Sequence, residues 1–206
     1  MLNGKFVDFN NQAGEYKFGK NTVLNANKPA INGLLHIIDG YTPYVNNLWE
    51  FIGKHENLDS LKNFLYGQSR NKFDPENSIE LGVNDDGEVI YDSVFKYSNP
   101  ILEKLGFIDT EDSVFTAIMP DNNAWTEAYS RIEGYYNFPE NGGGAIRQRA
   151  KTQTTLINDM LYRGIIENPE GVNKITSTGG NVFYNPGQLF SNTYETHELS
   201  NGKAFI

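Results

Sequence analysis

The 206-residue chain contains no cysteine. Without thiols it can form no disulfide framework, no thiolate nucleophile and no cysteine zinc site. Histidine is scarce as well, because only His36, His55 and His197 occur. There is no His-Glu-x-x-His zinc spacing and no Gly-x-Ser-x-Gly nucleophile motif. The sequence therefore predicts a protein that is not an enzyme and that folds without a metal or cofactor. A Ser-His-Asp set assembled only by folding would leave no local mark, so a hydrolase stays as a distant alternative.

Long apolar runs and excess basic charge are also missing. No run approaches the ~20 residues of a membrane span, so no transmembrane segment is expected. The formal net charge is -9 and the pI about 4.8. An acidic surface repels phosphate backbones and anionic lipid, which argues against nucleic acid as a partner. Residues 1–5 lack the apolar stretch of a signal peptide, so any export signal is expected to lie outside this sequence.

Two short patterns resemble ligand sites but are better explained as turns. Asp85, Asp86 and Glu88 lack the alternating ligands of a calcium loop, and Asp86-Gly87 is a hairpin signal. Residues 142–144 are three glycines before a basic helix, but the lysine-serine ending of a phosphate loop is absent. These patterns predict a hairpin and a flexible loop.

Apolar residues make up 38% of the chain and aromatic residues 13%, which is enough to build a core. Residues 1–40 alternate short apolar runs with turns, which predicts strands and no helix. Two helical faces follow, and Asn57 or Asp59 is the expected cap of the second helix. The apolar residues of these faces are Leu48, Trp49, Phe51 and Ile52, then Leu58, Leu61, Phe64 and Leu65. Residues 66–98 are a polar excursion.

The second half continues with mixed elements. Pro100 and Gly106 bound a short helix, and residues 114–119 read as a buried strand. Pro120-Asp121-Asn122-Asn123 ends that strand and caps a helix over 124–132. A further helix is expected over 145–161, with strands after it. Segregated helices and strands indicate an α+β fold, since a doubly wound α/β sheet alternates them regularly.

One short pattern occurs twice, about a domain's length apart. Asn32-Gly33 precedes the apolar residues 34–38, and Asn201-Gly202 precedes the apolar residues 204–206. Both copies follow strand-rich segments, which makes them more than a chance pair of Asn-Gly turns.

These residues resemble the fasciclin-like family, whose domains often occur in tandem. One family motif is a strand ending in Thr-x-Phe-Ala-Pro-Thr-Asn-x-Ala-Phe that runs into a helix. Residues 115–125 are similar to it, and the matching positions are Thr116, Pro120, Asn122 or Asn123, Ala124 and Trp125. The other motif is Asn-Gly-x-x-His-x-Ile-Asp in a late strand. Its matching positions are Asn32, Gly33, His36, Ile38 and Asp39.

The resemblance implies a β-sheet wedge with helices packed on it, in two parts. Residues 1–45 correspond to the closing strands of a first domain, and residues 46–206 to a second domain cut within its own closing motif at Asn201-Gly202. The family is extracellular and associated with adhesion and with matrix or polysaccharide contact. Some animal members use a Tyr-His pair for receptor binding; Tyr162 matches the tyrosine, but Arg163 replaces the histidine.

The residues and the resemblance together lead to a functional hypothesis. We expect an extracytoplasmic, cell-surface binding or adhesion module, with the character of a bacterial surface protein or lipoprotein, that contacts protein or polysaccharide. The alternative is a structural spacer that supports a neighbouring module. The expected binding residues are Asp121, Asn122, Tyr135, Tyr136 and Tyr162. For Pro120–Asn123 the turn-and-cap interpretation is favoured over a binding role.

The strand 34–38 carries a separate expectation. Leu34, His36 and Ile38 alternate on one face, and Leu35 and Ile37 lie on the other. Since both faces are apolar, the strand is expected to be internal to a sheet. It is also expected to dock on residues 46–206 or to associate with another copy. His36 is expected to be a core histidine bonded to the backbone.

Overall fold

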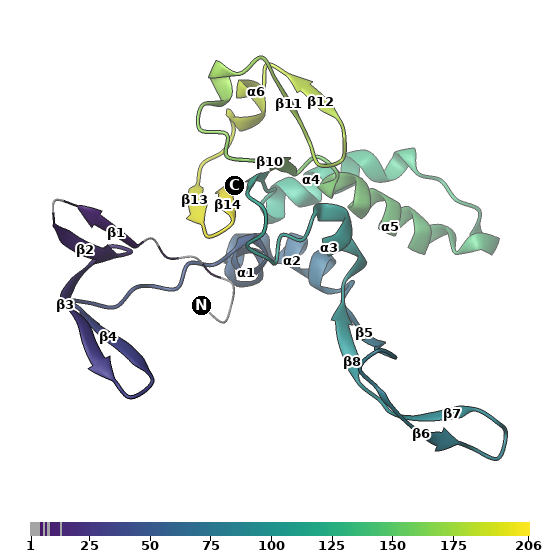
Figure 1. The fold of residues 1–206 in the computed structure, drawn as a ribbon. Helices are drawn as coiled ribbons and strands as arrows, with labels where there is room; N and C mark the ends of the chain where they lie inside the picture. The colour runs from purple at the N-terminus through teal and green to yellow at the C-terminus, as the bar shows by residue number, and fades with distance from the viewer. Residues whose placement is uncertain (1–4, 6, 8, 13) are drawn as a thin grey trace.

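A computed structural model describes residues 5, 7, 9–12 and 14–206 (Figure 1). Residues 1–4, 6, 8 and 13 of the predicted segment 1–45 lie outside this description. The rest of the chain forms a body of helices around a small sheet, from which two β-structures project. The predicted α+β class is confirmed. None of the described helices has both the length and the apolar character required to cross a bilayer.

The sheet at the centre of the body has four strands in the order β10-β9-β14-β13. Their bounds are Leu161–Arg163, Phe115–Ile118, Gly202–Phe205 and Thr196–Leu199. The two inner strands run parallel, with Ala204 opposite Ala117, and each outer strand is antiparallel to its neighbour. A strand from the last residues of the sequence therefore lies in the middle of the sheet.

Five helices bury one face of this sheet. They are α1 (Leu48–Lys54), α2 (Asp59–Tyr66), α3 (Pro100–Leu105), α4 (Asn122–Ile132) and α5 (Gly144–Ile157). All eight apolar residues predicted for the first two helices are buried in the resulting core. Phe115, Ala117, Leu161 and Ala204 contribute the inward side of the sheet. Side chains alternate between the two faces of a strand, so the residues next to these point to the opposite face of the sheet. That face must be covered by other parts of the chain.

A smaller layer covers that opposite side. It comprises β11 (Lys174–Thr176), β12 (Val182–Tyr184) and α6 (Gly187–Phe190). Tyr162 of β10 packs there with Ile175 and Phe190, and Ile118 and Phe205 join them. The body is thus a three-layer arrangement with the sheet in the middle (Figure 1).

Helix boundaries follow the sequence signals in part. Asn99 caps α3, and Gly106 ends it in a left-handed conformation with φ of 87°. The prediction of a helix to residue 161 is wrong, because α5 ends at Ile157 and Leu161 pairs with Ala117 in the sheet. The prediction that Asn57 or Asp59 caps α2 is also wrong: residue 58 is the N-cap position and no side chain of this segment caps the helix.

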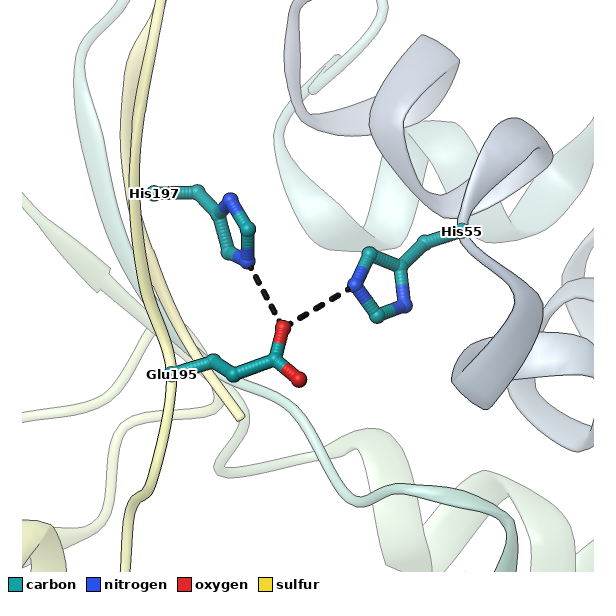
Figure 2. Close-up of side chains that lie close together, drawn as sticks. All are labelled: His55, Glu195 and His197. Atoms are coloured by element: carbon teal, nitrogen blue, oxygen red, sulfur yellow. Dashed lines mark hydrogen bonds and ion pairs between the residues drawn. The ribbon is translucent and has the colours of Figure 1, made fainter.

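β13 and β14 form a C-terminal hairpin. Three polar side chains connect this hairpin to the end of α1. Glu195 Oε2 lies 3.2 Å from His55 Nε2 and 3.0 Å from His197 Nε2 (Figure 2). His55 follows the last residue of α1, and His197 lies on β13. The contact joins segments 140 residues apart in the chain.

A second link is the buried Asn201, which lies just before β14. Its Oδ1 accepts a hydrogen bond from Leu48 N at 2.9 Å. Its Nδ2 donates to the carbonyl oxygens of Ile108 and Thr110, at 2.8 and 2.7 Å. One side chain therefore satisfies an otherwise unpaired donor at the start of α1 and two carbonyl groups of the loop after α3.

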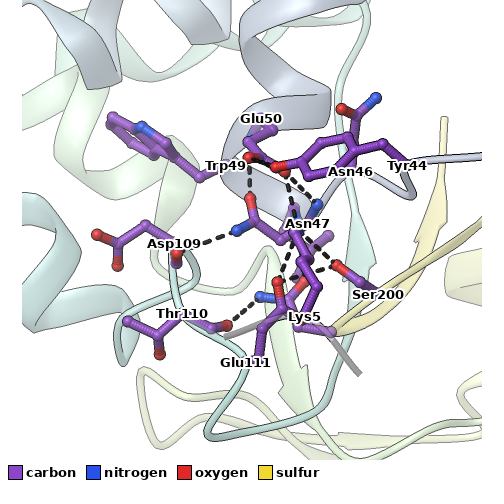
Figure 3. Close-up of polar contacts among 12 residues, drawn as sticks. Lys5, Tyr44, Asn46, Asn47, Trp49, Glu50, Asp109, Thr110, Glu111 and Ser200 are labelled. Carbon is purple, nitrogen blue, oxygen red and sulfur yellow. Dashed lines mark hydrogen bonds and ion pairs between the residues drawn. The ribbon is translucent and has the colours of Figure 1, made fainter. Parts of the chain in front are cut away.

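Lys5 adds an ionic contact beside this asparagine. Its buried ammonium lies 2.6 Å from Glu111 and 2.9 Å from Glu50, and it donates to Ser200 Oγ at 2.8 Å (Figure 3). Burial opposes the charge of Lys5, but the two carboxylates outweigh it and raise the pKa of the ammonium. Burial likewise opposes ionisation of Glu50, but hydrogen bonds from Tyr44, Lys5 and Asn47 outweigh it and lower the pKa of the carboxyl.

Two β-structures project from the body (Figure 1). The first is an antiparallel sheet of β1 (Phe9–Gln12), β2 (Glu15–Phe18), β3 (Asn21–Ala30) and β4 (Gly33–Ile38). The second is formed by residues 66–98, which the sequence analysis describes as a polar excursion. In it β5 (Arg70–Phe73) pairs with β8 (Phe95–Ser98), and β6 (Ile79–Val83) pairs with β7 (Val89–Asp92). The predicted turn at residues 84–87 connects β6 to β7.

The expectations that strand 34–38 is internal to a sheet and docks on residues 46–206 are wrong, whereas association with another copy stays a prediction. Among the described strands β4 pairs only with β3, and Leu34 and Leu35 are exposed on its two faces. It does not dock on the body, because the sheet extends away from the helices. His36 is exposed rather than in a core, although its Nδ1 accepts a hydrogen bond from Asn27 N at 3.4 Å.

The two Asn-Gly pairs occupy different environments. Asn32 lies in an exposed hairpin turn and the exposed Gly33 begins β4, whereas Asn201 and Gly202 are buried. A Cβ atom on Gly202 would lie 2.1 Å from the carbonyl oxygen of Phe115, while one on Gly33 would meet nothing within 4 Å. The glycine before β14 is therefore required for close contact of two backbones.

Alanine at the two glycines tests this difference. Gly202→Ala should destabilise the fold by about 3 kcal/mol, because the new methyl group displaces β14 from β9. Gly33→Ala should change the free energy of unfolding by less than about 0.5 kcal/mol. Urea denaturation of both variants measures the difference. Equal effects would show that the backbones of β9 and β14 are not in close contact.

The lowered pKa of Glu50 predicts a pH dependence of stability. A carboxyl with a lowered folded-state pKa contributes stability above its unfolded value of about 4.3, and this is lost as pH falls through the folded value. Glu50→Gln keeps a side chain suited to the capping box and should cost about 1 kcal/mol at pH 7, less at pH 3. Glu56→Gln, at an exposed position, is the control. A cost for Glu50→Gln that stays constant between the two pH values contradicts the ionic contribution.

Candidate functional site

The connection between β9 and α4 contains the most motif-like segment, and its first polar residue acts as a cap. Asp121 is the N-cap of α4, where its Oδ1 accepts a hydrogen bond from Ala124 N at 2.7 Å. Its Oδ2 accepts one from the Tyr194 hydroxyl at 3.1 Å. Both carboxylate oxygens of this predicted binding residue thus have partners within the body.

Asn122 joins two helices. Its Oδ1 accepts a hydrogen bond from Ser60 N at 2.8 Å, and its Nδ2 donates to the Glu56 carbonyl at 3.3 Å. α2 has no side-chain cap from its own segment. Asn122, the first residue of α4, supplies that cap instead. This contact explains why the local sequence around Asn57 was misleading.

The other motif positions of this segment are structural as well. Trp125 is buried, with its ring 5.9 Å from that of Phe64. Thr116 is fully buried; its hydroxyl donates to the Gly164 carbonyl and accepts from Ile166 N. In the other motif, Asp39 accepts a hydrogen bond from Thr22 N and so stabilises the pairing of β3 with β4. The turn-and-cap interpretation of residues 120–123 is in keeping with the contacts of Asp121 and Asn122.

A pocket of about 420 Å³ lies next to this connection, between the sheet and the layer of β12 and α6. Pro120, Asp121, Ala124 and Tyr162 are among the residues that line it, so the fold brings these sequence-predicted positions together. The walls are mainly apolar, with Phe183, Leu189 and Ile206 among them. The pocket offers contact area for an apolar group rather than a set of reacting groups.

Two polar residues of the pocket wall, Tyr162 and Asp159, are respectively buried and hydrogen-bonded within the body. Burial, followed by the charge of Asp159, raises the pKa of Tyr162 to about 12, and this tyrosine is only 2% exposed. Asp159 accepts hydrogen bonds from Ser177 Oγ at 2.6 Å and Asn181 Nδ2 at 3.0 Å. Tyr162 is therefore a packing residue and is not presented to a surface partner.

The aromatic residues after α4 do not form an open platform. Tyr135 is largely exposed, but the Tyr136 hydroxyl is hydrogen-bonded to Thr155 Oγ1 at 2.7 Å. The Phe138 ring is covered by the guanidinium of Arg147, 4.8 Å from the ring centroid. A sugar ring needs a free aromatic face for stacking, and among these three residues Tyr135 alone is largely exposed.

The projecting hairpins expose apolar side chains to an unusual degree. In β6 and β7 the exposed residues are Ile79, Leu81, Val83, Val89 and Ile90. In β3, β4 and the turn between them they are Leu24, Ile31, Leu34, Leu35 and Ile37. Exposed apolar side chains gathered on one projecting element favour an interaction site. The alternating pattern in the sequence indicates strands, but it cannot show that no second layer covers them.

The cluster of His55, Glu195 and His197 was missed from the sequence. Nothing in the local sequence connects residue 55 with residue 197. The only available signal was Glu195-x-His197, since residues two apart lie on one face of a strand. The fold supplies the third member from α1.

Comparison of the sequence with known proteins identifies no relative. No model of a known protein family matches the chain, and no curated protein is similar to it. The fasciclin-like resemblance therefore rests on the motif residues alone.

Replacing the two neighbouring asparagines distinguishes a structural from a binding role. Asn122→Ala should lower the free energy of unfolding by about 1 kcal/mol, because it uncaps α2. Asn123→Ala, at an exposed position of the same helix turn, should have little effect. Thermal unfolding of the two variants provides the measurement. If Asn122→Ala unfolds like the unmodified protein, the hydrogen bond to Ser60 does not stabilise α2.

Proposed function

We propose that the chain is an extracytoplasmic, cell-surface binding module that holds a protein partner on the projecting hairpin of β6 and β7. The observation that carries the proposal is the exposed apolar surface of residues 79–92 on a two-stranded ribbon. The partner would contribute an extended segment that adds a strand to this ribbon.

The ribbon has backbone groups available for such pairing. Within the described residues β6 and β7 pair only with each other, so each has one edge without a neighbouring strand. A two-stranded hairpin is marginally stable in water, and a third strand supplies both hydrogen bonds and apolar cover. A partner strand would therefore stabilise the hairpin as it binds.

The charge of the hairpin specifies the chemistry of the partner. Residues 79–92 contain five carboxylate side chains and no lysine or arginine. Asp85, Asp86 and Glu88 lie at or beside the turn. A segment that combines basic with apolar side chains matches this surface, because opposite charges favour encounter and disfavour the wrong partners.

A protein partner is better supported than a polysaccharide. Of Tyr135, Tyr136 and Phe138, Tyr135 alone is largely exposed, whereas β6 and β7 together expose five aliphatic side chains. The cell-surface part of the proposal is supported by the fasciclin-like motif residues at 32–39 and 115–125. The acidic composition is in keeping with a partner other than nucleic acid.

A designed peptide tests the hairpin directly. An eight-residue peptide of alternating lysine and valine should bind, and it should slow hydrogen exchange of amides 79–92. A peptide of alternating glutamate and valine should not bind, because its charge repeats that of the hairpin. Ile79→Ser should weaken binding about tenfold through lost apolar contact. Ile146→Ser is the matched control, since Ile146 is 79% exposed but lies on α5.

Two outcomes would reject the proposal. One is equal binding of the lysine and glutamate peptides, which would mean that charge does not select the partner. The other is absence of protection in residues 79–92 at saturating peptide. In that case the hairpin is not a binding surface, and a structural spacer becomes the better explanation.

A further inference from the structure

We infer that His55, Glu195 and His197 form a binding site for a divalent transition-metal ion, with Zn²⁺ as the expected ligand. The site joins α1 to the C-terminal hairpin (Figure 2). It is independent of the proposed partner-binding hairpin.

The three side chains converge because of the elements that carry them. Glu195 and His197 are two residues apart in extended backbone at the start of β13, so both project toward α1. His55 is the C-cap residue that directly follows α1, and its ring points back toward the strand (Figure 2). Two imidazoles and one carboxylate are thereby presented from opposite sides of a small space.

The spacing of the donor atoms fits a metal site. One donor atom from each residue lies within 4.8 Å of the other two. The Nε2 atoms of His55 and His197 are 3.2 and 3.0 Å from the same carboxylate oxygen, Glu195 Oε2. Ligands of a tetrahedral zinc ion, at about 2.0–2.1 Å from the metal, lie about 3.3 Å from each other. Small side-chain rotations would therefore place a cation among the three groups.

The donor set selects the class of ion. Two imidazole nitrogens with one carboxylate suit Zn²⁺, Co²⁺, Ni²⁺ or Cu²⁺, whereas Ca²⁺ and Mg²⁺ prefer oxygen ligands. A bound cation would take the place of the two hydrogen bonds that now join the imidazole Nε2 atoms to Glu195 Oε2.

The surroundings hold the rings and leave one side open. The Phe51 ring centroid lies 5.0 Å from that of His55 and 4.7 Å from that of His197, which restricts both imidazoles. The His55, Glu195 and His197 side chains are 17%, 34% and 34% exposed, so water or a partner's donor can reach a fourth position. His55 Nδ1 is buried with no hydrogen-bond partner among the described residues, so its orientation lacks outer support and the affinity should be modest.

Direct titration of the protein without an affinity tag tests the site. After treatment with a chelator, the chain should bind one Zn²⁺ by calorimetry, and Co²⁺ should give the visible absorption of tetrahedral coordination. The NMR signals of His55 and His197 should shift on addition of Zn²⁺, and those of His36 should not. Only three histidines are present, so the signals can be assigned without relying on a variant's fold.

Three variants locate the ion. His197→Ala and Glu195→Gln should each abolish the Co²⁺ absorption and the rise in melting temperature that saturating Zn²⁺ causes. His36→Ala should retain both, since His36 lies on the projecting sheet. Lack of Zn²⁺ binding by the unmodified chain would overturn the inference. So would binding that persists in His197→Ala, or that shifts the signals of His36 as much as those of His55.

Discussion

The body of the protein depends on one buried side chain, that of Asn201. It joins the start of α1, the loop after α3 and the start of β14 through three hydrogen bonds. Each bonded group would otherwise be a buried donor or acceptor without a partner, which costs about 1–3 kcal/mol per group. Because Gly202 follows directly, the backbone can approach β9 closely enough to bring the asparagine into position. The ionic contact of Lys5 with Glu50 and Glu111 lies beside the same junction.

The projecting β-structures stand in contrast to this body. The residues of the main core come from the helices, the central sheet and adjoining turns, and none from β1–β8. Local openings of a protein are easiest where few apolar contacts are buried. The hairpin of β6 and β7 can therefore change its pairing without disturbing Asn201 or the metal-binding cluster. A rigid body with an adaptable edge is well suited to holding an extended partner.

Sequence reasoning succeeded where neighbouring residues decide the outcome. The apolar faces of α1 and α2, the Pro100 start and Gly106 end of α3, and the Asp121 cap of α4 all follow from local chemistry. It failed where a distant segment decides. Asn122 replaced the expected cap of α2, and Leu161 joined a strand because Ala117 was there to pair with it. The apolar pattern of residues 34–38 predicted burial, but no layer formed by the described residues covers them. For the same reason His55 could not be associated with His197, which only the fold brings near.

The parallel pairing of β14 with β9 has a consequence for how the chain reaches this structure. β14 is formed by residues 202–205, yet it lies between β9 and β13 in the centre of the sheet. On a ribosome, β9 and α1 emerge long before the strand that completes their core. Until then Phe115 and Leu48 must stay exposed to water or be covered transiently, which favours aggregation during synthesis. Closing so long a loop also slows the final step, because contacts between distant residues carry a high entropic cost. The native sheet is thus expected to form late and in one cooperative event, after β14 has left the ribosome.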